Sequence, residues 1–157
     1  MKLTAPASRG RSRPPPTLRR HAEPGHAAGR LRRAIVHGDA DPATALDDLL
    51  ALLMPHTVAE ETGLFAELRA EGSLTTAVDQ LCAEHDDIHG VLVAVDRAAP
   101  DWPTVLAALD RLHRHMDNEE HGLFPAAVIA LPIDAWDRIT PDHPQDRRAA
   151  RQPAAAR

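Results

Sequence analysis

The segment HTVAEETGLF at residues 56–65 recurs without a gap as HMDNEEHGLF at residues 115–124. Both copies read His-x-x-x-Glu-Glu-x-Gly-Leu-Phe, and the second copy lies 59 positions after the first (115 minus 56). Residues four apart lie on one face of a helix, about 6 Å apart along its axis, so the His and the first Glu of each copy point the same way. The repeat therefore predicts two related helical hairpins that pack against each other.

Helical periodicity extends outward from both copies of the repeat and is interrupted only by short breaks. Long helices are predicted at about residues 21–36, 41–70, 73–98 and 103–130, with a short amphipathic helix at 134–139. Asp41 before Pro42 is a typical helix start, Ser73 is the expected N-cap of the third helix, and Pro55 should bend the second. Because short breaks join antiparallel neighbours, we expect an all-α, up-down-up-down antiparallel four-helix bundle.

The bundle is predicted to span residues 18–140, with a disordered tail on each side. Residues 1–17 are rich in Arg and Pro and contain no acidic residue, which is typical of a disordered basic arm. Residues 141–157 have a similar Pro, Arg and Ala-rich composition. The formal net charge of −5 does not suit a nucleic-acid binder, so we expect a solvated arm rather than one that contacts nucleic acid or anionic lipid.

Composition sets the kind of core and the expected compartment. Hydrophobic residues make up 43% of the chain but aromatic residues only 3%, with no Tyr, so the core must consist of Leu, Ala and Val, which suit helices. Cys82 is the single cysteine, so no internal disulfide can form. No apolar run reaches the roughly 18 residues of a membrane span, and the N-terminus lacks the apolar core of a signal peptide. We expect a cytoplasmic protein without a membrane partner.

Each predicted helix carries a histidine on its apolar stripe. The clearest stripe, in the third helix, has spacings of four and three: Leu74, Val78, Leu81, His85, Ile88, Leu92 and Val95. The other stripes place His21, His56 with Glu60, and His115 with Glu119 at about the same depth. A carboxylate buried alone in an apolar core is costly, so imidazoles and carboxylates at one level need a common partner. A metal cation supplies it.

The types of ligand narrow the choice of metal. Imidazole and carboxylate without thiolate suit iron, manganese or zinc. The candidate ligands are five imidazoles and two carboxylates: His21, His56, His85, His89, His115, Glu60 and Glu119. Two bridging carboxylates, five imidazoles and a bridging oxygen fill all but one of the about twelve positions that two six-coordinate metals offer. The remaining position could take a small diatomic ligand.

The duplicated motif, with Ala83-Glu84-His85 between its copies, resembles the hemerythrin-like HHE cation-binding family. The resemblance covers about residues 20–140. It implies a four-helix bundle that holds two non-haem iron ions as an oxo- or hydroxo-bridged di-iron centre, with manganese or zinc as alternatives. By the family pattern His56, Glu60, His85, His115 and Glu119 are ligands, and His89 matches the second histidine of the His-x-x-x-His seen in oxygen-carrying members.

Two of the candidate ligands, His21 in the first helix and Glu119, each have an alternative nearby in the sequence. His21 has the right facing, but Pro24 follows it and should strain or restart the helix. His26 lies 30 residues before His56, as His85 lies 30 before His115. We favour His21 and keep His26 open. Glu120 is the rival of Glu119.

Three functions are compatible with these residues. The leading hypothesis is a binding protein that takes up O2 or NO, or senses or handles iron, at the di-iron centre, rather than an enzyme. The first alternative is a ferritin-like di-iron oxidase or a peroxide-handling enzyme, which uses Glu-x-x-His pairs rather than the His-x-x-x-Glu order found here. The second alternative is a metal-free helical interaction module.

Overall fold

The computed structural model describes residues 21–139, and these residues form helices and no strand. The elements are α1 (Ala22–His37), α2 (Pro42–Glu60), η2 (Glu61–Phe65), α3 (Ala66–Ala70), α4 (Thr75–Val93), α5 (Trp102–Asn118), η3 (Glu119–Leu123), α6 (Phe124–Ala130) and α7 (Ile133–Ile139). The tails predicted at residues 1–17 and 141–157 lie outside the described residues. No helix of the described part is long and apolar enough to cross a lipid bilayer.

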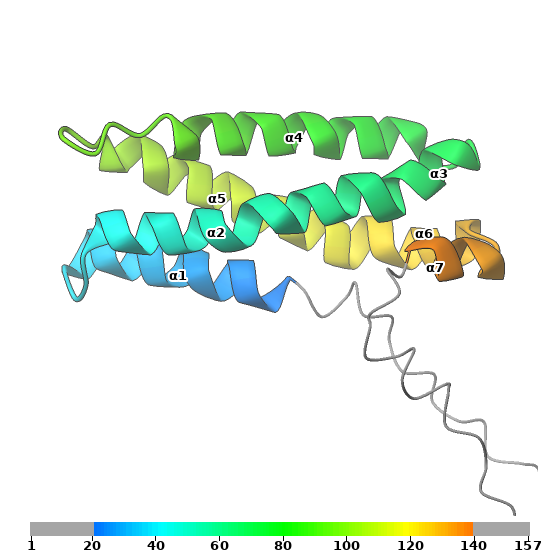
Figure 1. Cartoon of the computed structure of the whole chain (residues 1–157), viewed down its shortest axis with the longest axis horizontal. Helices are drawn as coiled ribbons and strands as arrows, with labels where there is room; N and C mark the ends of the chain where they lie inside the picture. Colours follow the sequence, from blue (N-terminus) through cyan, green and yellow to red (C-terminus); the bar gives the residue numbers. More distant parts are fainter. Residues whose placement is uncertain (1–20, 140–157) are drawn as a thin grey trace, which may run out of the picture.

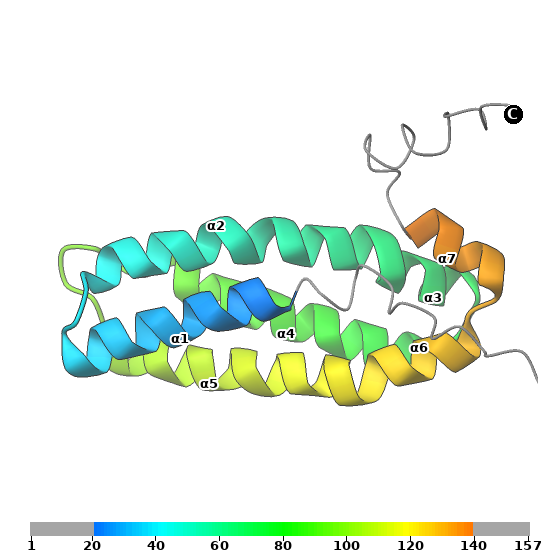
Figure 2. The same cartoon turned by 90° about the horizontal axis from the view of Figure 1, so that it is seen from below.

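The helical segments join into long rods that lie side by side (Figures 1 and 2). One rod is α2, η2 and α3 in succession, and another is α5, η3 and α6. The shorter α1 and the longer α4 each contact both of these rods, along α2 and α5. The predicted short helix is α7, which packs against η2 and α3 at one end of the molecule.

Local sequence signals set several helix ends. Asp41 and Asp101 each stand before a helix that has Pro in its first turn. The Asp41 carboxylate accepts a hydrogen bond from the Thr44 N–H at 3.0 Å, and the Asp101 carboxylate accepts one from the Thr104 N–H at 3.2 Å. Both bonds satisfy N–H groups that the helix leaves unpaired. Gly38 ends α1 in the left-handed conformation, with φ 65°.

The third long helix is shorter at both ends than its sequence predicts. The prediction that Ser73 is the N-cap of this helix is wrong. The Ser73 N–H donates to the Leu68 carbonyl at 2.9 Å and closes the preceding helix, with Gly72 in the left-handed conformation. Helix α4 therefore begins at Thr75. It ends at Val93 rather than near residue 98, where Asp96 accepts a hydrogen bond from the Ala98 N–H and forms a local turn.

Two π-helical segments interrupt the rods that carry the repeated motif. Helix α2 continues through Pro55, and the departure from α-helical geometry comes later, in η2. In the other copy of the motif, η3 follows α5 at the equivalent point. A π segment inserts one extra residue per turn, which shifts the buried face. It allows the adjacent Leu64 and Phe65 both to be buried behind Glu60.

Two apolar clusters fill the interior, one on each side of the polar residues of the motif. The first is built around Leu31, Leu46, Leu49, Leu53, Ile88, Leu92, Val105, Leu109 and Leu112. The second is built around Leu64, Phe65, Leu68, Val78, Leu81, Leu123, Phe124, Ala127 and Ile139. The predicted stripe of α4 is buried from Val78 to Leu92, with His85 in its middle. A polar layer thus separates two dry halves of the core.

Candidate metal centre

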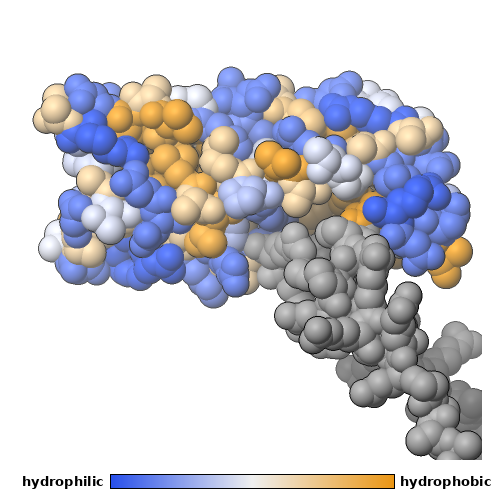
Figure 3. Space-filling view, viewed as in Figure 1, coloured by the Kyte–Doolittle hydropathy of each residue, from blue (hydrophilic) through white to orange (hydrophobic). Residues whose placement is uncertain are grey.

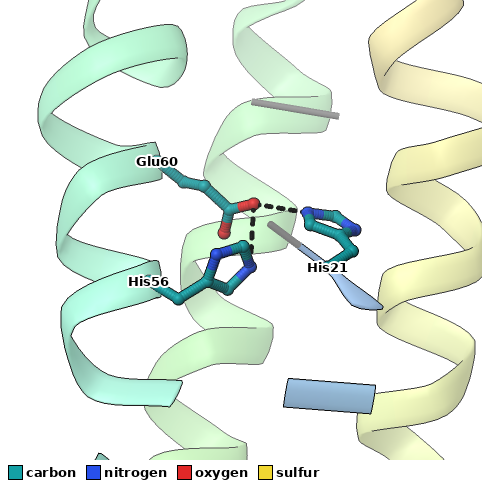
Figure 4. Close-up of side chains that lie close together, drawn as sticks. All are labelled: His21, His56 and Glu60. Atoms are coloured by element: carbon teal, nitrogen blue, oxygen red, sulfur yellow. Dashed lines mark hydrogen bonds and ion pairs between the residues drawn. The ribbon is translucent and has the colours of Figure 1, made fainter. Parts of the chain in front are cut away.

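The first cluster consists of His21, His56 and Glu60 (Figure 4). His56 and Glu60 lie one turn apart on α2, and His21 enters from the start of α1. Glu60 Oε1 lies 2.7 Å from His21 Nε2 and 3.1 Å from His56 Nε2. Only 1% of the His21 side chain and 8% of the Glu60 side chain are exposed. One carboxylate oxygen and two imidazole nitrogens therefore converge in the interior.

The second cluster consists of His85, His115 and Glu119. His85 comes from the middle of α4, while His115 and Glu119 lie one turn apart at the junction of α5 and η3. His115 Nε2 lies 3.4 Å from Glu119 Oε2, and the His85 and His115 rings are 4.5 Å apart between centroids. All three side chains are buried, and Glu119 has no exposed surface. Within each cluster, the candidate ligand atoms lie within 4.8 Å of one another.

The two carboxylates connect the clusters. Glu60 Oε2 lies 3.6 Å from His85 Nε2 of the second cluster, while its other oxygen contacts the first. Glu119 Oε2 lies 3.6 Å from His21 Nε2 of the first cluster. Each carboxylate therefore reaches imidazole nitrogens of both clusters. Two cations held here could share both carboxylates as bridging ligands.

Buried polar atoms without hydrogen-bond partners test whether these residues fit a cation. Among the described residues, five such side-chain atoms occur: His21 Nδ1, Glu60 Oε2, His115 Nε2 and both oxygens of Glu119. All five belong to the two clusters. A charged group that is buried and unpaired destabilises a fold by roughly several kcal/mol. A cation coordinated by these lone pairs would remove most of the penalty, so the donor set fits a metal site.

Comparison with protein families gives the same assignment. The family model described as the hemerythrin HHE cation-binding domain matches residues 18–127, which include both clusters. The chain belongs to this hemerythrin family. No curated protein and no solved structure matched the chain. Hemerythrin-family membership and the two His and Glu clusters together show a cation-binding domain that could hold a pair of ions.

The electrostatics of this hemerythrin-family centre favour charged groups in spite of burial. Burial alone would raise the pKa of Glu60, but hydrogen bonds from His21 and His56 bring it well below its ordinary range. Burial alone would lower the pKa of His21 and of His115. The hydrogen bond between His21 and Glu60 and the negative charges of Glu60 and Glu119 outweigh burial and raise both pKa values. The contacts between imidazoles and carboxylates therefore offset part of the cost of burying these groups.

The structure separates the two helix-one candidates. His21 is buried in the first cluster, and its carbonyl accepts a hydrogen bond from the Gly25 N–H at 3.1 Å. Pro24 lies in the first turn of α1, where its missing N–H would be unpaired anyway, so it neither breaks nor restarts the helix. His26 is exposed and lies outside both clusters, because the helix turns its side chain away from the core.

The remaining predicted ligands lie beside the clusters rather than in them. The His89 ring stacks on His85, with 5.9 Å between centroids, but its Nε2 lies 3.2 Å from the Thr57 hydroxyl and belongs to neither cluster. Burial lowers the pKa of His89, and the neighbouring His85 lowers it further. Glu120, the rival of Glu119, is 45% exposed, with Oε1 3.6 Å from His21 Nδ1. Glu119 is therefore the interior carboxylate of the second motif.

Two further carboxylates touch the clusters. Glu61 Oε1 lies 3.0 Å from His85 Nδ1, and Glu84 Oε2 lies 2.9 Å from His115 Nδ1. The sequence could have indicated Glu61, because it is the second Glu of the duplicated Glu-Glu pair. The equivalent residue of the other copy, Glu120, faces His21 Nδ1. No comparable repeat marks Glu84, which only its contact with a neighbouring helix identifies.

Proposed function

We propose that the chain holds two iron ions as a non-haem di-iron centre, one ion in each cluster, with Glu60 and Glu119 as bridging ligands. The observation that carries this proposal is the connection between the clusters, since each carboxylate lies within 3.6 Å of imidazole nitrogens on both sides. Imidazole and carboxylate donors without thiolate suit iron, although manganese and zinc accept the same set. The proposed ligands are His21, His56, Glu60, His85, His115 and Glu119.

This ligand set leaves room for an exogenous molecule. Without His89, four imidazoles and two bridging carboxylates fill about eight of the about twelve positions of two six-coordinate metals. Ferrous iron in such a centre supplies reversible binding of O2 or NO. We therefore propose that the domain binds a small diatomic ligand, or senses or handles iron, rather than carrying out multiple-turnover catalysis.

Two phenylalanine side chains beside the clusters support the proposal of a small, weakly polar ligand. The Phe65 ring is stacked on His85, with 5.9 Å between centroids, and the Phe124 ring lies 4.9 Å from His21. Both phenylalanines are buried in the second apolar cluster. Apolar walls exclude water and leave the nearby polar groups to the metal and its ligand.

We also propose that the four long rods form the up-down-up-down antiparallel bundle expected from the short connections, over residues 18–140. The contacts of α1 and α4 with both α2 and α5 support this arrangement. In such a bundle, side chains on facing helices build cofactor sites in the interior.

Anaerobic reconstitution tests the proposed function. The metal-free protein would be titrated with Fe²⁺, desalted and analysed for iron, and the expected result is two iron ions per chain. Exposure to air should produce a charge-transfer band in the near ultraviolet, and O2, NO or azide should alter the spectrum. His56→Ala and His115→Ala should each lose iron, while His26→Ala, which alters an exposed histidine, should not. Parallel titrations with Mn²⁺ and Zn²⁺ identify the preferred metal, and a chain that retains no iron would refute the proposal.

A further inference from the structure

The two clusters differ in how their imidazoles are held. In the second cluster, both histidines turn Nε2 inward and place Nδ1 against a carboxylate of a neighbouring helix or π segment. Glu61 at the start of η2 faces His85 of α4, and Glu84 of α4 faces His115 of α5. Each Nδ1–H can donate to its carboxylate, which leaves the Nε2 lone pair directed at the cluster. Two carboxylates thus fix the tautomer and the ring orientation of both histidines.

The first cluster lacks an equivalent support for His21. Its Nδ1 is buried and has no hydrogen-bond partner among residues 21–139, where the Glu120 carboxylate oxygen lies 3.6 Å away. His21 is also only the N-cap residue of α1, at a helix end, where helices fray, whereas His85 lies in the middle of a long helix.

We propose that Glu61 and Glu84 are positioning residues that make the second cluster the tighter of the two metal positions, so that the ions load in sequence. This inference rests on the proposed function, because it presupposes two ions. Carboxylates that orient a ligating histidine change metal affinity by about 10- to 100-fold. The second cluster has two such partners, and residues 21–139 supply none at His21 Nδ1, so the two binding steps should differ in affinity.

Glu84 is also accessible, which makes the proposal testable. It lines a surface cleft of about 410 Å3 between α4 and α5, together with Asp87, Arg111, Arg114 and His115. About 30% of the Glu84 side chain is exposed, and 37% of that of Glu61. Substitutions at these half-exposed positions leave the apolar clusters intact, so the variants should fold. Asp87 is exposed and lines the same cleft, and it makes no hydrogen bond with His85 or His115. Asp87→Ala is therefore the matched control.

The experiment measures Co²⁺ binding to the metal-free full chain under anaerobic conditions, by calorimetry and by the absorption of bound Co²⁺. The wild type should bind two ions in two steps of different affinity. His115→Ala should remove the tighter step, and His21→Ala the weaker one. Glu84→Ala and Glu61→Ala should weaken the tighter step by about 10- to 100-fold and change its spectrum, while Asp87→Ala should change neither.

Conservative variants separate positioning from folding. Glu84→Gln keeps an acceptor for His115 Nδ1 and should restore part of the affinity lost in Glu84→Ala, with the same urea unfolding midpoint for both metal-free variants. Two ions bound with affinities unchanged in Glu61→Ala and Glu84→Ala would overturn the inference but leave the proposed function standing. Loss of the tighter step in His21→Ala would overturn the proposed order in the same way. A wild type that binds no ion would refute both.

Discussion

Replacing Glu119 by Gln should move stability in opposite directions with and without metal. Glu119 has no exposed surface, and within the part of the chain that the structure describes neither of its oxygens has a hydrogen-bond partner. Its nearest cationic groups, His115 Nε2 and His21 Nε2, lie 3.4 and 3.6 Å away, longer than a good charge-assisted hydrogen bond. The metal-free protein therefore keeps a poorly compensated buried charge, and removing it should stabilise the fold by about 1–3 kcal/mol.

With metal bound, the Glu119→Gln protein should instead be less stable than the wild type. An ion at 100 times its dissociation constant stabilises the folded state by about 2.7 kcal/mol, and Glu119→Gln removes a bridging ligand on which that stabilisation depends. Thermal unfolding would be followed by circular dichroism with chelator and with Fe²⁺ under anaerobic conditions. A change of 1 kcal/mol corresponds to roughly 4 °C in Tm for a domain of this size. Glu120→Gln, at the half-exposed neighbour, should change little in either condition. A metal-free Glu119→Gln protein less stable than wild type would refute the reasoning.

Three further predictions concern the fold and its pH dependence. Phe65→Ala, which empties a fully buried position, should lower the free energy of unfolding by about 3–5 kcal/mol in urea titrations, and a loss below about 1 kcal/mol would contradict the packing. Gly38→Ala should destabilise by about 1–2 kcal/mol because its φ of 65° is left-handed, whereas Gly90→Ala, in the last turn of α4 with open space at its Cβ, should stabilise by about 0.5–1 kcal/mol. A change in the free energy of unfolding with the same sign in both variants would be inconsistent with these backbone conformations. The raised pKa values of His21 and His115 contribute stability that is present below about pH 6.5 and lost as pH rises through their folded pKa values. Urea titrations of the metal-free protein between about pH 6 and 8 should therefore show declining stability, opposed in part by His89, whose pKa is lowered, and a steady increase would contradict the ion pairs.

The sequence predicts the helical character and the depth of the cluster residues because both follow from periodicity. The spacing of Val78, Leu81, His85, Ile88 and Leu92 determines which face of α4 is buried, whatever the details of its neighbours. The inward orientation of His21 was inferred in the same way, by extending the apolar stripe of the first helix toward its N-terminus. Those inferences need only the 3.6-residue repeat of an α-helix.

Features that depend on neighbouring helices could not be predicted in the same way. The π segments after Glu60 and before Phe124 change the register of a helix and leave no mark in composition. The contact of Glu84 with His115 joins residues 31 positions apart on different helices. The prediction for Ser73 was wrong because the chain closes the previous helix at Ser73, and Leu74, in the left-handed conformation, occupies the N-cap position of α4 instead.

The charged layer between the two apolar clusters also has a consequence for how the rods can slide past one another. Moving either rod that carries a buried carboxylate, Glu60 in α2 or Glu119 in η3, lengthwise by one turn, about 5.4 Å, would shift that carboxylate toward an apolar cluster. An all-leucine interior would tolerate such slippage at little cost, as uniform cores do. The groups proposed to hold the ions therefore also fix the axial alignment of the helices before any ion arrives.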